Sequence, residues 1–307
     1  MKLAAVSVDI DEIDNYAAIY GLSGALDVSL TAVYDKALPR LGALFAELDV
    51  PCTFFAIGRD LTRAENVAQL RALHAAGHEI ANHSLNHYYD LTRRDRNTQQ
   101  REVRGGADAI EAAVGARPVG FRAPGYTITD QLFEVLAGEA VRYDSSVFPC
   151  PPYYLAKAAA IGLIKARGRQ SRSVVDDPRV LSAPAEPYYV GRPYYRRGAG
   201  LREFPIGVSG DWSMRLPYIG TTVALAGERG ARWLTRLASR SFVNLELHGI
   251  DLSDAHEDGL RGLVPYQQDL RRSAAEKRLA LASALSELKR QGYTFVTLAE
   301  ATRRLAA

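Results

Sequence analysis

This 307-residue sequence contains few cysteines and carries a small net charge. Its two cysteines, Cys52 and Cys150, are too few for a disulfide framework or a cysteine-rich zinc site. The formal net charge is only +3, and the basic residues are spread out rather than gathered into runs. This pattern gives no indication of a nucleic-acid partner. Hydrophobic residues make up 47% of the chain, which is enough to bury the core of an ordinary globular protein.

Long apolar segments are also missing. No apolar run reaches the ~18 residues that a membrane-spanning helix needs. The opening, MKLAAVSVDIDEIDN, carries Asp9 and Asp11 within its apolar stretch, whereas a secretory signal needs a longer uncharged core. From these two absences we predict a cytoplasmic protein without a transmembrane segment.

Short apolar segments alternate with helical patterns along the chain. We predict strands over residues 3–10, 52–58, 78–84, 119–125, 141–147, 202–208, 242–249 and 293–300. We predict helices over residues 33–48, 64–76, 98–114 and 275–291. Glycine directly follows the last three, as expected of a residue that ends helices in a left-handed conformation. Such alternation is typical of an α/β protein with a parallel sheet, and about seven or eight units of this kind would close into a barrel.

Residues 148–201 interrupt this rhythm. The segment is rich in proline, glycine and paired tyrosines and has little clean periodicity. We predict that it is a long insertion in one barrel domain spanning residues 1–307. Its tyrosines would either wall a groove for sugar rings or pack a long loop onto the barrel. They are Tyr153, Tyr154, Tyr188, Tyr189, Tyr194 and Tyr195.

Unusual polar residues fall at the ends of four predicted strands. They are Asp9 and Asp11 on the first, His83 on the third, Arg122 on the fourth and His248 on the seventh. In a parallel barrel the carboxyl ends of the strands form one face, so we expect these side chains to meet there. Because residues two apart on a strand share a face, Asp9 and Asp11 would both point into the site.

A second histidine, His87, follows His83 by four residues. On a helical turn, both imidazoles would project to the same side. Taken alone, each motif also fits a structural role, such as turn capping or a core histidine with satisfied hydrogen bonds. Their coincidence at the ends of four strands makes a joint catalytic role the better interpretation.

The four motifs, SVDID, HSLNH, FRAPG and LELHG, resemble in order and spacing those of the polysaccharide deacetylases. This family is also called the NodB-homology or carbohydrate esterase family 4 enzymes. The resemblance runs from about residue 3 to about residue 300 and is to the subset with a D-x-D motif, because Ile10 separates two aspartates that are adjacent in the best-known pattern. It implies a distorted (β/α) barrel and the hydrolysis of an N-acetyl group on an amino sugar or glycan.

The resemblance also implies a role for each motif residue. The ligands of one divalent metal ion would be Asp11, His83 and His87. Zinc suits such an N/N/O set, and cobalt, nickel or iron would fit it equally.

The proton-transfer groups follow from the same resemblance. Asp9 would be the general base that activates water, and His248 would be the general acid that protonates the departing amine. Arg122 would pair with Asp9, hold it in place and keep it ionised. A backbone N–H at Gly125 or Tyr126 would stabilise the oxyanion. Trp212 is the candidate for the tryptophan that often walls the site in this family.

Two other functions stay open at this point. The first is another C–N hydrolase on the same scaffold, such as a deformylase of a lipid-linked amino sugar or an allantoinase-like amidohydrolase. The second is a non-catalytic carbohydrate-binding protein on an inherited barrel, which is disfavoured because base, ligands, arginine and acid are all present.

The expected partner is an N-acetylated sugar, a glycan or a lipid-linked sugar. Residues 215–242 form a basic amphipathic pattern that fits either the outer face of a barrel helix or contact with a membrane surface.

Overall fold

A computed structural model of the chain describes residues 2–22, 27–210 and 215–305. Its main element is a nine-stranded sheet in the order β10-β1-β2-β3-β4-β5-β7-β6, with β11 beside β1. In this sheet β6 lies antiparallel to β7 and the other pairings are parallel, while β8 and β9 form a separate antiparallel pair. The strands are β1 (Lys2–Asp9), β2 (Cys52–Ala56), β3 (Glu79–Asn82), β4 (Gly120–Phe121), β5 (Tyr143–Asp144), β6 (Tyr188–Val190), β7 (Arg197–Glu203), β8 (Val208–Ser209), β9 (Leu216–Pro217), β10 (Phe242–His248) and β11 (Tyr293–Phe295).

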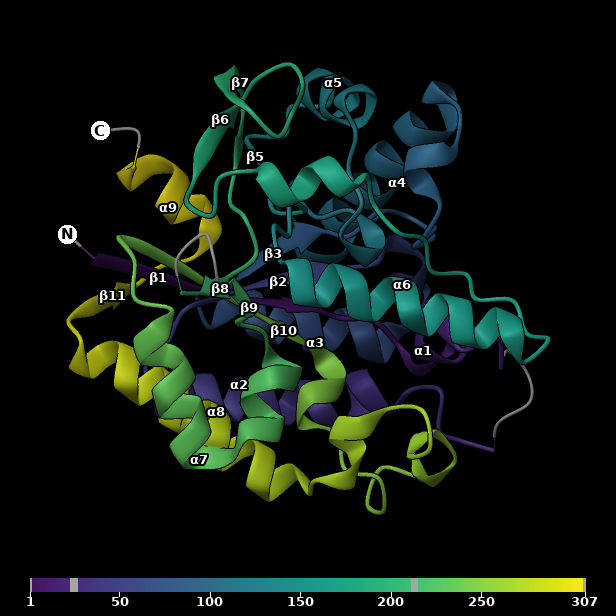
Figure 1. Ribbon diagram of the computed structural model, residues 1–307, viewed down its shortest axis with the longest axis vertical. Coiled ribbons are helices and arrows are strands. Elements are labelled where there is room, and N and C mark those ends of the chain that lie inside the picture. Colours follow the sequence, from purple (N-terminus) through teal and green to yellow (C-terminus); the bar gives the residue numbers. More distant parts are fainter. Residues whose placement is uncertain (1, 23–26, 211–214, 306–307) are drawn as a thin grey trace.

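Helices cover the sheet, as expected for parallel strands joined by helical crossovers. Figure 1 shows α2, α7 and α8 on one side of the sheet, α4 and α5 toward the other, and α6 crossing in front of the strands. Among the helices that the structure describes, none combines the length and the hydropathy of a membrane span. The helices are α1 (Ile13–Ile19), α2 (Leu38–Glu47), α3 (Ala64–Ala75), α4 (Arg96–Val114), α5 (Asp130–Gly138), α6 (Pro151–Ala166), α7 (Gly220–Leu237), α8 (Ala274–Arg290) and α9 (Leu298–Arg304).

The sheet curls into a distorted barrel, which confirms the predicted α/β fold class. The segment that follows β7 supplies hydrogen bonds across the gap between β5 and β10. On one side the Phe204 N–H donates to the carbonyl of Asp144 at 2.8 Å, and on the other the Gly207 N–H donates to the carbonyl of Asn244 at 2.9 Å. Irregular chain rather than a regular ladder therefore joins these two strands.

Alternation along β1 decides which of its side chains face the barrel interior. Leu3 and Ala5 pack in an interior cluster with Phe55 and other apolar side chains. The same alternation puts Ser7 and Asp9 inside, at the carboxyl end of the strand. The intervening residues pack instead in the larger core beneath the helices; they are Ala4, Val6 and Val8.

Several predicted strands are shorter than their apolar patterns. The predicted strands over 119–125 and 141–147 reduce to the two residues of β4 and the two of β5. The prediction over 293–300 is wrong beyond Phe295, because Thr297 caps α9 by accepting a hydrogen bond from the Glu300 N–H at 3.2 Å. The predicted strand over 202–208 overlaps only the end of β7 and the start of β8, and the short strands β6 and β9 were not predicted.

The helix predictions over 64–76, 98–114 and 275–291 are confirmed by α3, α4 and α8. Asp95 caps the first turn of α4, and Gly115 ends the helix at a φ of 78°, which favours glycine. Within 148–201, where little periodicity was found, the chain forms the 16-residue helix α6. No residue of α6 is fully buried, so it needs no one-sided apolar stripe and gives no helical pattern.

Residues 215–242, the basic amphipathic segment, contain α7. This helix buries Val223, Ala231 and Leu234 against the barrel, and Trp233 stays 54% exposed. Its Arg236 pairs with Glu287 of α8 at 3.0 Å. The helix is therefore an outer barrel helix, and membrane contact stays a prediction.

Candidate active site

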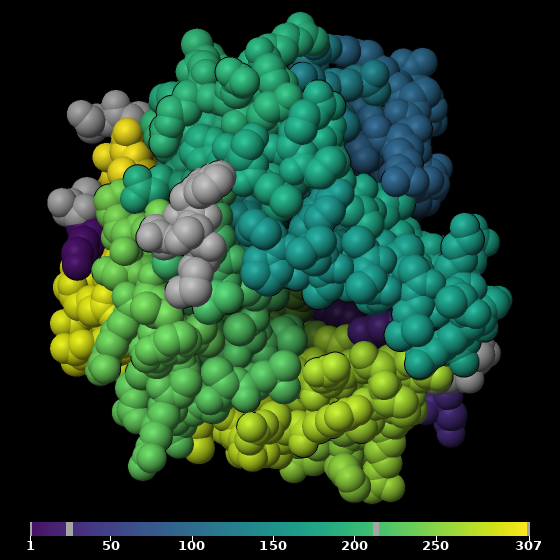
Figure 2. All heavy atoms as spheres, in the orientation of Figure 1, coloured from purple at the N-terminus to yellow at the C-terminus, as the bar shows by residue number. Residues whose placement is uncertain are grey.

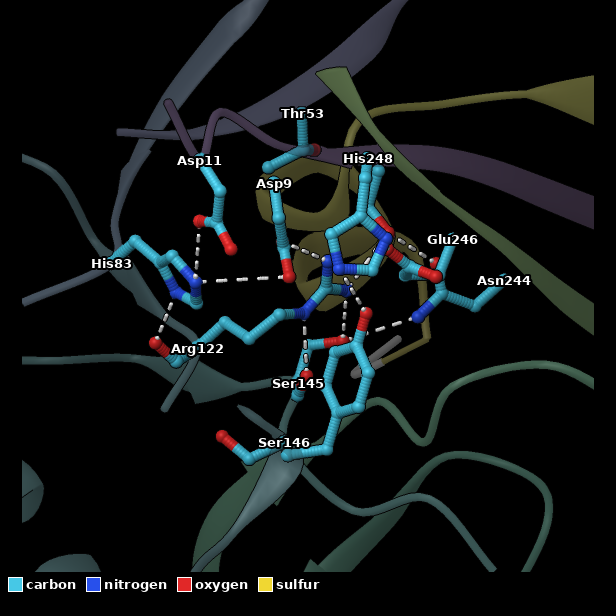
Figure 3. Close-up of polar contacts among 12 residues, drawn as sticks. Asp9, Asp11, Thr53, His83, Arg122, Ser145, Ser146, Asn244, Glu246 and His248 are labelled. Carbon is cyan, nitrogen blue, oxygen red and sulfur yellow. Dashed lines mark hydrogen bonds and ion pairs between the residues drawn. The ribbon is translucent and has the colours of Figure 1, made fainter. Parts of the chain in front are cut away.

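Strand register brings the predicted base and acid together. Asp9 ends β1 and lies directly opposite His248, which ends β10. On its other side Asp9 is paired with Phe55 of β2. Figure 3 shows Asp9 between His83 and His248, with the Arg122 side chain reaching the same point from below. The carboxyl ends of separate strands thus meet as the sequence predicted.

The three predicted metal ligands, Asp11, His83 and His87, form one compact and buried cluster. The Asp11 Oδ1 atom lies 3.4 Å from His83 Nε2 and 3.3 Å from His87 Nε2. The two Nε2 atoms are 3.2 Å apart. A tetrahedral ion with bonds of about 2.0–2.1 Å would separate its ligands by about 3.3–3.4 Å. The spacing of these three atoms therefore fits a divalent cation.

Hydrogen bonding also prepares this cluster for a metal. The Nδ1 atom of His83 lies 2.7 Å from the Arg122 carbonyl oxygen, which can only accept, so Nδ1 carries the proton. That tautomer leaves the Nε2 lone pair of a neutral His83 facing Asp11. Asp11 Oδ1 is buried without a hydrogen-bond donor. A buried carboxylate oxygen without a donor is the kind of group that a cation would satisfy.

Burial and neighbouring charges together shift the pKa values of the cluster. Burial would raise the pKa of Asp11, but His87 and His83 outweigh it and hold the pKa well below its usual range. Burial lowers the pKa of His87, which favours the neutral form that binds metal. For His83, the charges of Asp9 and Asp11 outweigh burial and raise the pKa.

The chain between His83 and His87 is not helical, so the expected helical turn is wrong. Ser84 and His87 have φ values of 69° and 56°, and the Ser84 hydroxyl accepts a hydrogen bond from the His87 N–H at 3.0 Å. This tight loop brings the two imidazole rings to 4.8 Å between centroids. Asp11 likewise lies beyond the end of β1, in the turn before α1, so it reaches the site without sharing the strand face of Asp9.

Arg122 is fully buried, and its guanidinium organises Asp9, the predicted base. It donates to Asp9 Oδ1 at 2.6 Å, to the Ser7 hydroxyl at 2.8 Å and to the Ser145 hydroxyl at 2.8 Å. Its Nε donates to the Ser145 carbonyl at 2.7 Å, and its charge lies 4.2 Å from the centre of the Phe55 ring. These contacts fix the orientation of Asp9 and compensate its charge.

His248 lies between a carboxylate and a phenol. Its Nδ1 is 3.2 Å from Glu246 Oε1, and its Nε2 is 3.1 Å from the Tyr126 hydroxyl. Burial would lower the pKa of His248, but Glu246 and then Asp9 raise it to about 9. The imidazole is therefore protonated at neutral pH, as a general acid must be. Asp251 accepts a hydrogen bond from the His248 backbone N–H at 2.8 Å and so caps the following turn.

Asp9, Glu246 and His248 also lie close enough together to hold an ion. The Arg122 guanidinium already supplies a positive charge at Asp9, 2.6 Å away. A second cation at this point would be repelled by that charge. We therefore interpret this trio as the proton-transfer group and the Asp11 cluster as the metal site.

The two residues predicted for oxyanion binding, Gly125 and Tyr126, already make other hydrogen bonds. Tyr126 has a φ of 56°, and its N–H already donates to the carbonyl of Ala123 at 3.2 Å, while its hydroxyl faces His248. Gly125 accepts a hydrogen bond at its carbonyl from Lys157 Nζ at 2.7 Å. Trp212 lies outside the described residues. The oxyanion roles of Gly125 and Tyr126 stay predictions.

The tyrosines of 148–201 divide between two surroundings. Tyr188 and Tyr194 are buried, and the Tyr188 hydroxyl donates to the Tyr194 carbonyl at 3.0 Å, so they pack the loop. Tyr153 packs beside Tyr126, with 6.0 Å between ring centroids, and so stands next to the site.

Three polar residues of the site were not predicted from the sequence: Ser7, Asn244 and Glu246. Ser7 donates to Asn244 at 3.0 Å, and Asn244 donates to Ser145 at 3.1 Å, which extends the network around Arg122. Their signal is visible in the sequence. In FVNLELHG, polar residues occupy alternate positions up to His248, so they share its strand face.

Comparison with known proteins finds a family match in the first half of the chain. The family model described as Polysaccharide deacetylase matches residues 27–143, which include His83, His87 and Arg122. This match agrees with what the motifs indicated: residues 27–143 of the chain belong to a polysaccharide deacetylase domain. No curated protein matches the chain in sequence.

Solved structures share the fold at low sequence identity. A protein from Mycobacterium smegmatis described as a polysaccharide deacetylase is 18% identical, with a TM-score of 0.53 over 97% of this chain and 94% of that one. A family 4 acetyl xylan esterase from Clostridium thermocellum, in complex with a cobalt ion, is 16% identical, with a TM-score of 0.50 over 97% of this chain and 89% of that one.

A third structure has this fold but is described as a pseudoenzyme. It is a family 4 pseudoenzyme from Bacillus anthracis, 13% identical, with a TM-score of 0.50 over 98% of this chain and 65% of that one. Because an inactive protein has the same fold, the fold alone does not establish catalysis. Activity in this chain must therefore be inferred from its own residues.

Proposed function

We propose that this chain is a metal-dependent deacetylase that hydrolyses the N-acetyl group of an amino sugar or glycan. The family assignment supports deacetylation in general. The observation that supports the proposal is the convergence of an Asp/His/His cluster with Asp9 and His248 at one end of the barrel.

Asp11, His83 and His87 would hold the divalent cation, for which zinc is our first choice. When bound, such an ion supplies a Lewis acid that polarises the acetyl carbonyl and acidifies water. Asp9 accepts the proton of the attacking water, and its carboxylate is held for that purpose by Arg122.

His248 completes the reaction. As the C–N bond breaks, its imidazolium donates a proton to the departing nitrogen, so the products are acetate and a free amine. Glu246 lies 3.2 Å from His248 Nδ1 and favours the charged imidazolium. The Tyr126 hydroxyl lies 3.1 Å from Nε2 and orients the ring.

A substrate screen tests this proposal. Protein reconstituted with zinc or cobalt would be incubated with N-acetylated chitooligomers, peptidoglycan fragments and lipid-linked amino sugars, with O-acetylated xylan and ureides as comparisons. We expect equal amounts of acetate and free amine from an N-acetylated substrate. Formate with free amine would favour the deformylase alternative, and acetate without amine would indicate an esterase. No hydrolysis of any substrate by the metal-loaded protein would contradict an enzymatic function.

The cytoplasmic location and the single domain with an insertion at 148–201 stay predictions. Limited proteolysis would test the second, because one barrel domain should resist cleavage except in exposed loops.

A further inference from the structure

The helix α6, within the predicted insertion, packs one side against the turn that carries Tyr126. Tyr153 and Lys157 are four residues apart on α6, so they lie on the same side of the helix. The Tyr153 ring meets the Tyr126 ring edge-on, with 6.0 Å between centroids. The Lys157 Nζ atom donates to the carbonyl of Gly125 at 2.7 Å. Figure 2 shows the teal atoms of the segment that includes α6 on the front face of the molecule.

Lys157 differs from the other lysine of this helix. Lys165 is exposed, whereas Lys157 is partly buried. Burial lowers the pKa of Lys157 to about 8, and the charge of Asp176 offsets only part of this effect. A lysine on a surface helix normally keeps its ammonium in water, because burying a charge costs free energy. Among the described residues, the Gly125 carbonyl is the only acceptor of a hydrogen bond from this ammonium.

The contact fixes one end of the peptide bond between Gly125 and Tyr126. The carbonyl of this peptide accepts from Lys157, and its N–H donates to the Ala123 carbonyl at 3.2 Å. The residues on either side are left-handed, with φ values of 65° for Gly125 and 56° for Tyr126. This conformation costs a residue such as tyrosine about 1–2 kcal/mol, so it persists only where its surroundings hold it. The orientation of the peptide therefore depends on Lys157 and Ala123 together.

The same turn sets the position of the Tyr126 hydroxyl. The side chain of Tyr126 is buried, and its hydroxyl lies 3.1 Å from His248 Nε2. Because the backbone at Tyr126 determines where its side chain leaves the turn, a change in the peptide would move the hydroxyl away from the imidazole. An unbroken series of contacts thus leads from Lys157 through the turn to His248.

We propose that Lys157 is a positioning residue for the acid: by holding the Gly125 carbonyl, it keeps the Tyr126 hydroxyl on His248 Nε2. The inference rests on the proposed deacetylase function and gives α6 a part in the reaction. Lys157 acts through Tyr126 rather than by touching the substrate. Its removal should therefore reduce the step in which the oriented imidazolium donates its proton and leave substrate binding nearly unchanged.

Nitrogen-15 NMR of histidine-labelled, zinc-loaded protein would follow the hydrogen bond at His248 without any substrate. The His248 signals are those that disappear in His248→Gln. The variants are Lys157→Met, which keeps the length of the side chain but removes its charge, and Tyr126→Phe. Lys165→Met is the matched control, because Lys165 is an exposed lysine of the same helix. No residue of α6 is fully buried, so Lys157→Met should fold, which circular dichroism would check.

We expect the His248 Nε2 signal to move in Lys157→Met in the same direction as in Tyr126→Phe, and to stay in place in Lys165→Met. The physical reason is that both changes weaken the same hydrogen bond. An Nε2 signal that is unchanged in folded Lys157→Met would overturn the proposal.

Kinetics on the substrate that the screen identifies would test the path through Tyr126. Lys157→Met should lower kcat about 3- to 10-fold, the effect of one hydrogen bond, and change KM less than about 2-fold. The double variant Lys157→Met/Tyr126→Phe should be no slower than Tyr126→Phe alone, because both changes remove the same contact. Losses that multiply in the double variant would show that Lys157 acts by another route and would overturn the proposal.

The NMR result is independent of the proposed activity. A shifted Nε2 signal in Lys157→Met, in a protein that hydrolyses none of the substrates, would support the positioning contact and contradict the deacetylase. Acetate release by the wild type with an unchanged signal in Lys157→Met would do the reverse.

Discussion

Asp9 and His248, the proposed base and acid, lie on neighbouring strands but are held in opposite ways. Asp9 is buried and fixed by Arg122, whose other donors go to Ser7 and Ser145. On the acid side, both carboxylate oxygens of Glu246 are buried without an aligned hydrogen bond, and the side chain of His248 is 23% exposed. Asp9 is therefore positioned by a hydrogen-bond network, whereas the positive charge of His248 is favoured mainly by the proximity of a carboxylate.

This difference suits the two proposed tasks, which are to accept a proton at Asp9 and to donate one from His248. A base that must receive a proton at one atom benefits from a fixed orientation and a compensated charge. An acid must release its proton to a departing group, so it must reach the substrate and recover its proton from solvent. Burial is the largest cause that raises the pKa of Glu246, to about 7. Between that pH and the pKa of His248, about 9, the carboxylate and the imidazolium are both charged.

The largest expected effect comes from removing the base. Asp9→Asn should lower kcat about 10³-fold or more, within the range of about 10²–10⁴ for general-base catalysis, and leave the metal bound. The reason is that the metal ligands are other residues. Steady-state kinetics together with the metal content of the same sample would check this. Normal turnover with a full metal complement would show that Asp9 is not the base.

Removing the partner of the base should mainly affect stability. Arg122→Ala leaves a buried aspartate without its counter-charge, and we expect a loss of about 3–5 kcal/mol in the free energy of unfolding. Denaturant titration would measure it. The matched control is Arg117→Ala, since Arg117 makes its ion pairs at the surface and should cost about 1 kcal/mol or less. Similar losses for both variants would contradict the fixed-base description.

Changing the acid side should shift the pH dependence. Glu246 raises the pKa of His248, so Glu246→Gln should lower it. Because His248 acts when protonated, activity falls as pH rises through its pKa. The alkaline limb of the kcat/KM profile should therefore move to lower pH in the variant, by about 1 pH unit or more. An unchanged alkaline limb would mean that Glu246 does not control the acid.

The smallest effect is expected at Tyr126. Tyr126→Phe removes one hydrogen bond to the imidazole, which we expect to cost about 10-fold or less in kcat. The alkaline limb should stay near its wild-type position, since no charge is removed. A loss as large as that of Asp9→Asn would instead assign the hydroxyl a direct part in proton transfer.

Much of the site could be predicted from the sequence, because its residues stand at the ends of predicted strands or at a recognisable spacing from them. Asp9, Asp11, His83, His87, Arg122 and His248 all lie together. The unpredicted part depends on contacts between distant segments. The left-handed Ser84 and His87 replace the expected helical turn, and no local pattern shows them in advance. The closure of the barrel by the segment at Phe204 is likewise set by partners far apart in the chain.

The metal count per chain tests the central claim most directly. Elemental analysis of protein reconstituted with excess zinc and then freed of unbound metal should give about one ion per wild-type chain, as one N/N/O site implies. His83→Ala should give close to none, with its fold checked by circular dichroism. Two ions per wild-type chain would mean that Asp9, Glu246 and His248 also bind metal. Retention of the ion in folded His83→Ala would contradict the assignment of the Asp11, His83 and His87 cluster as the metal site.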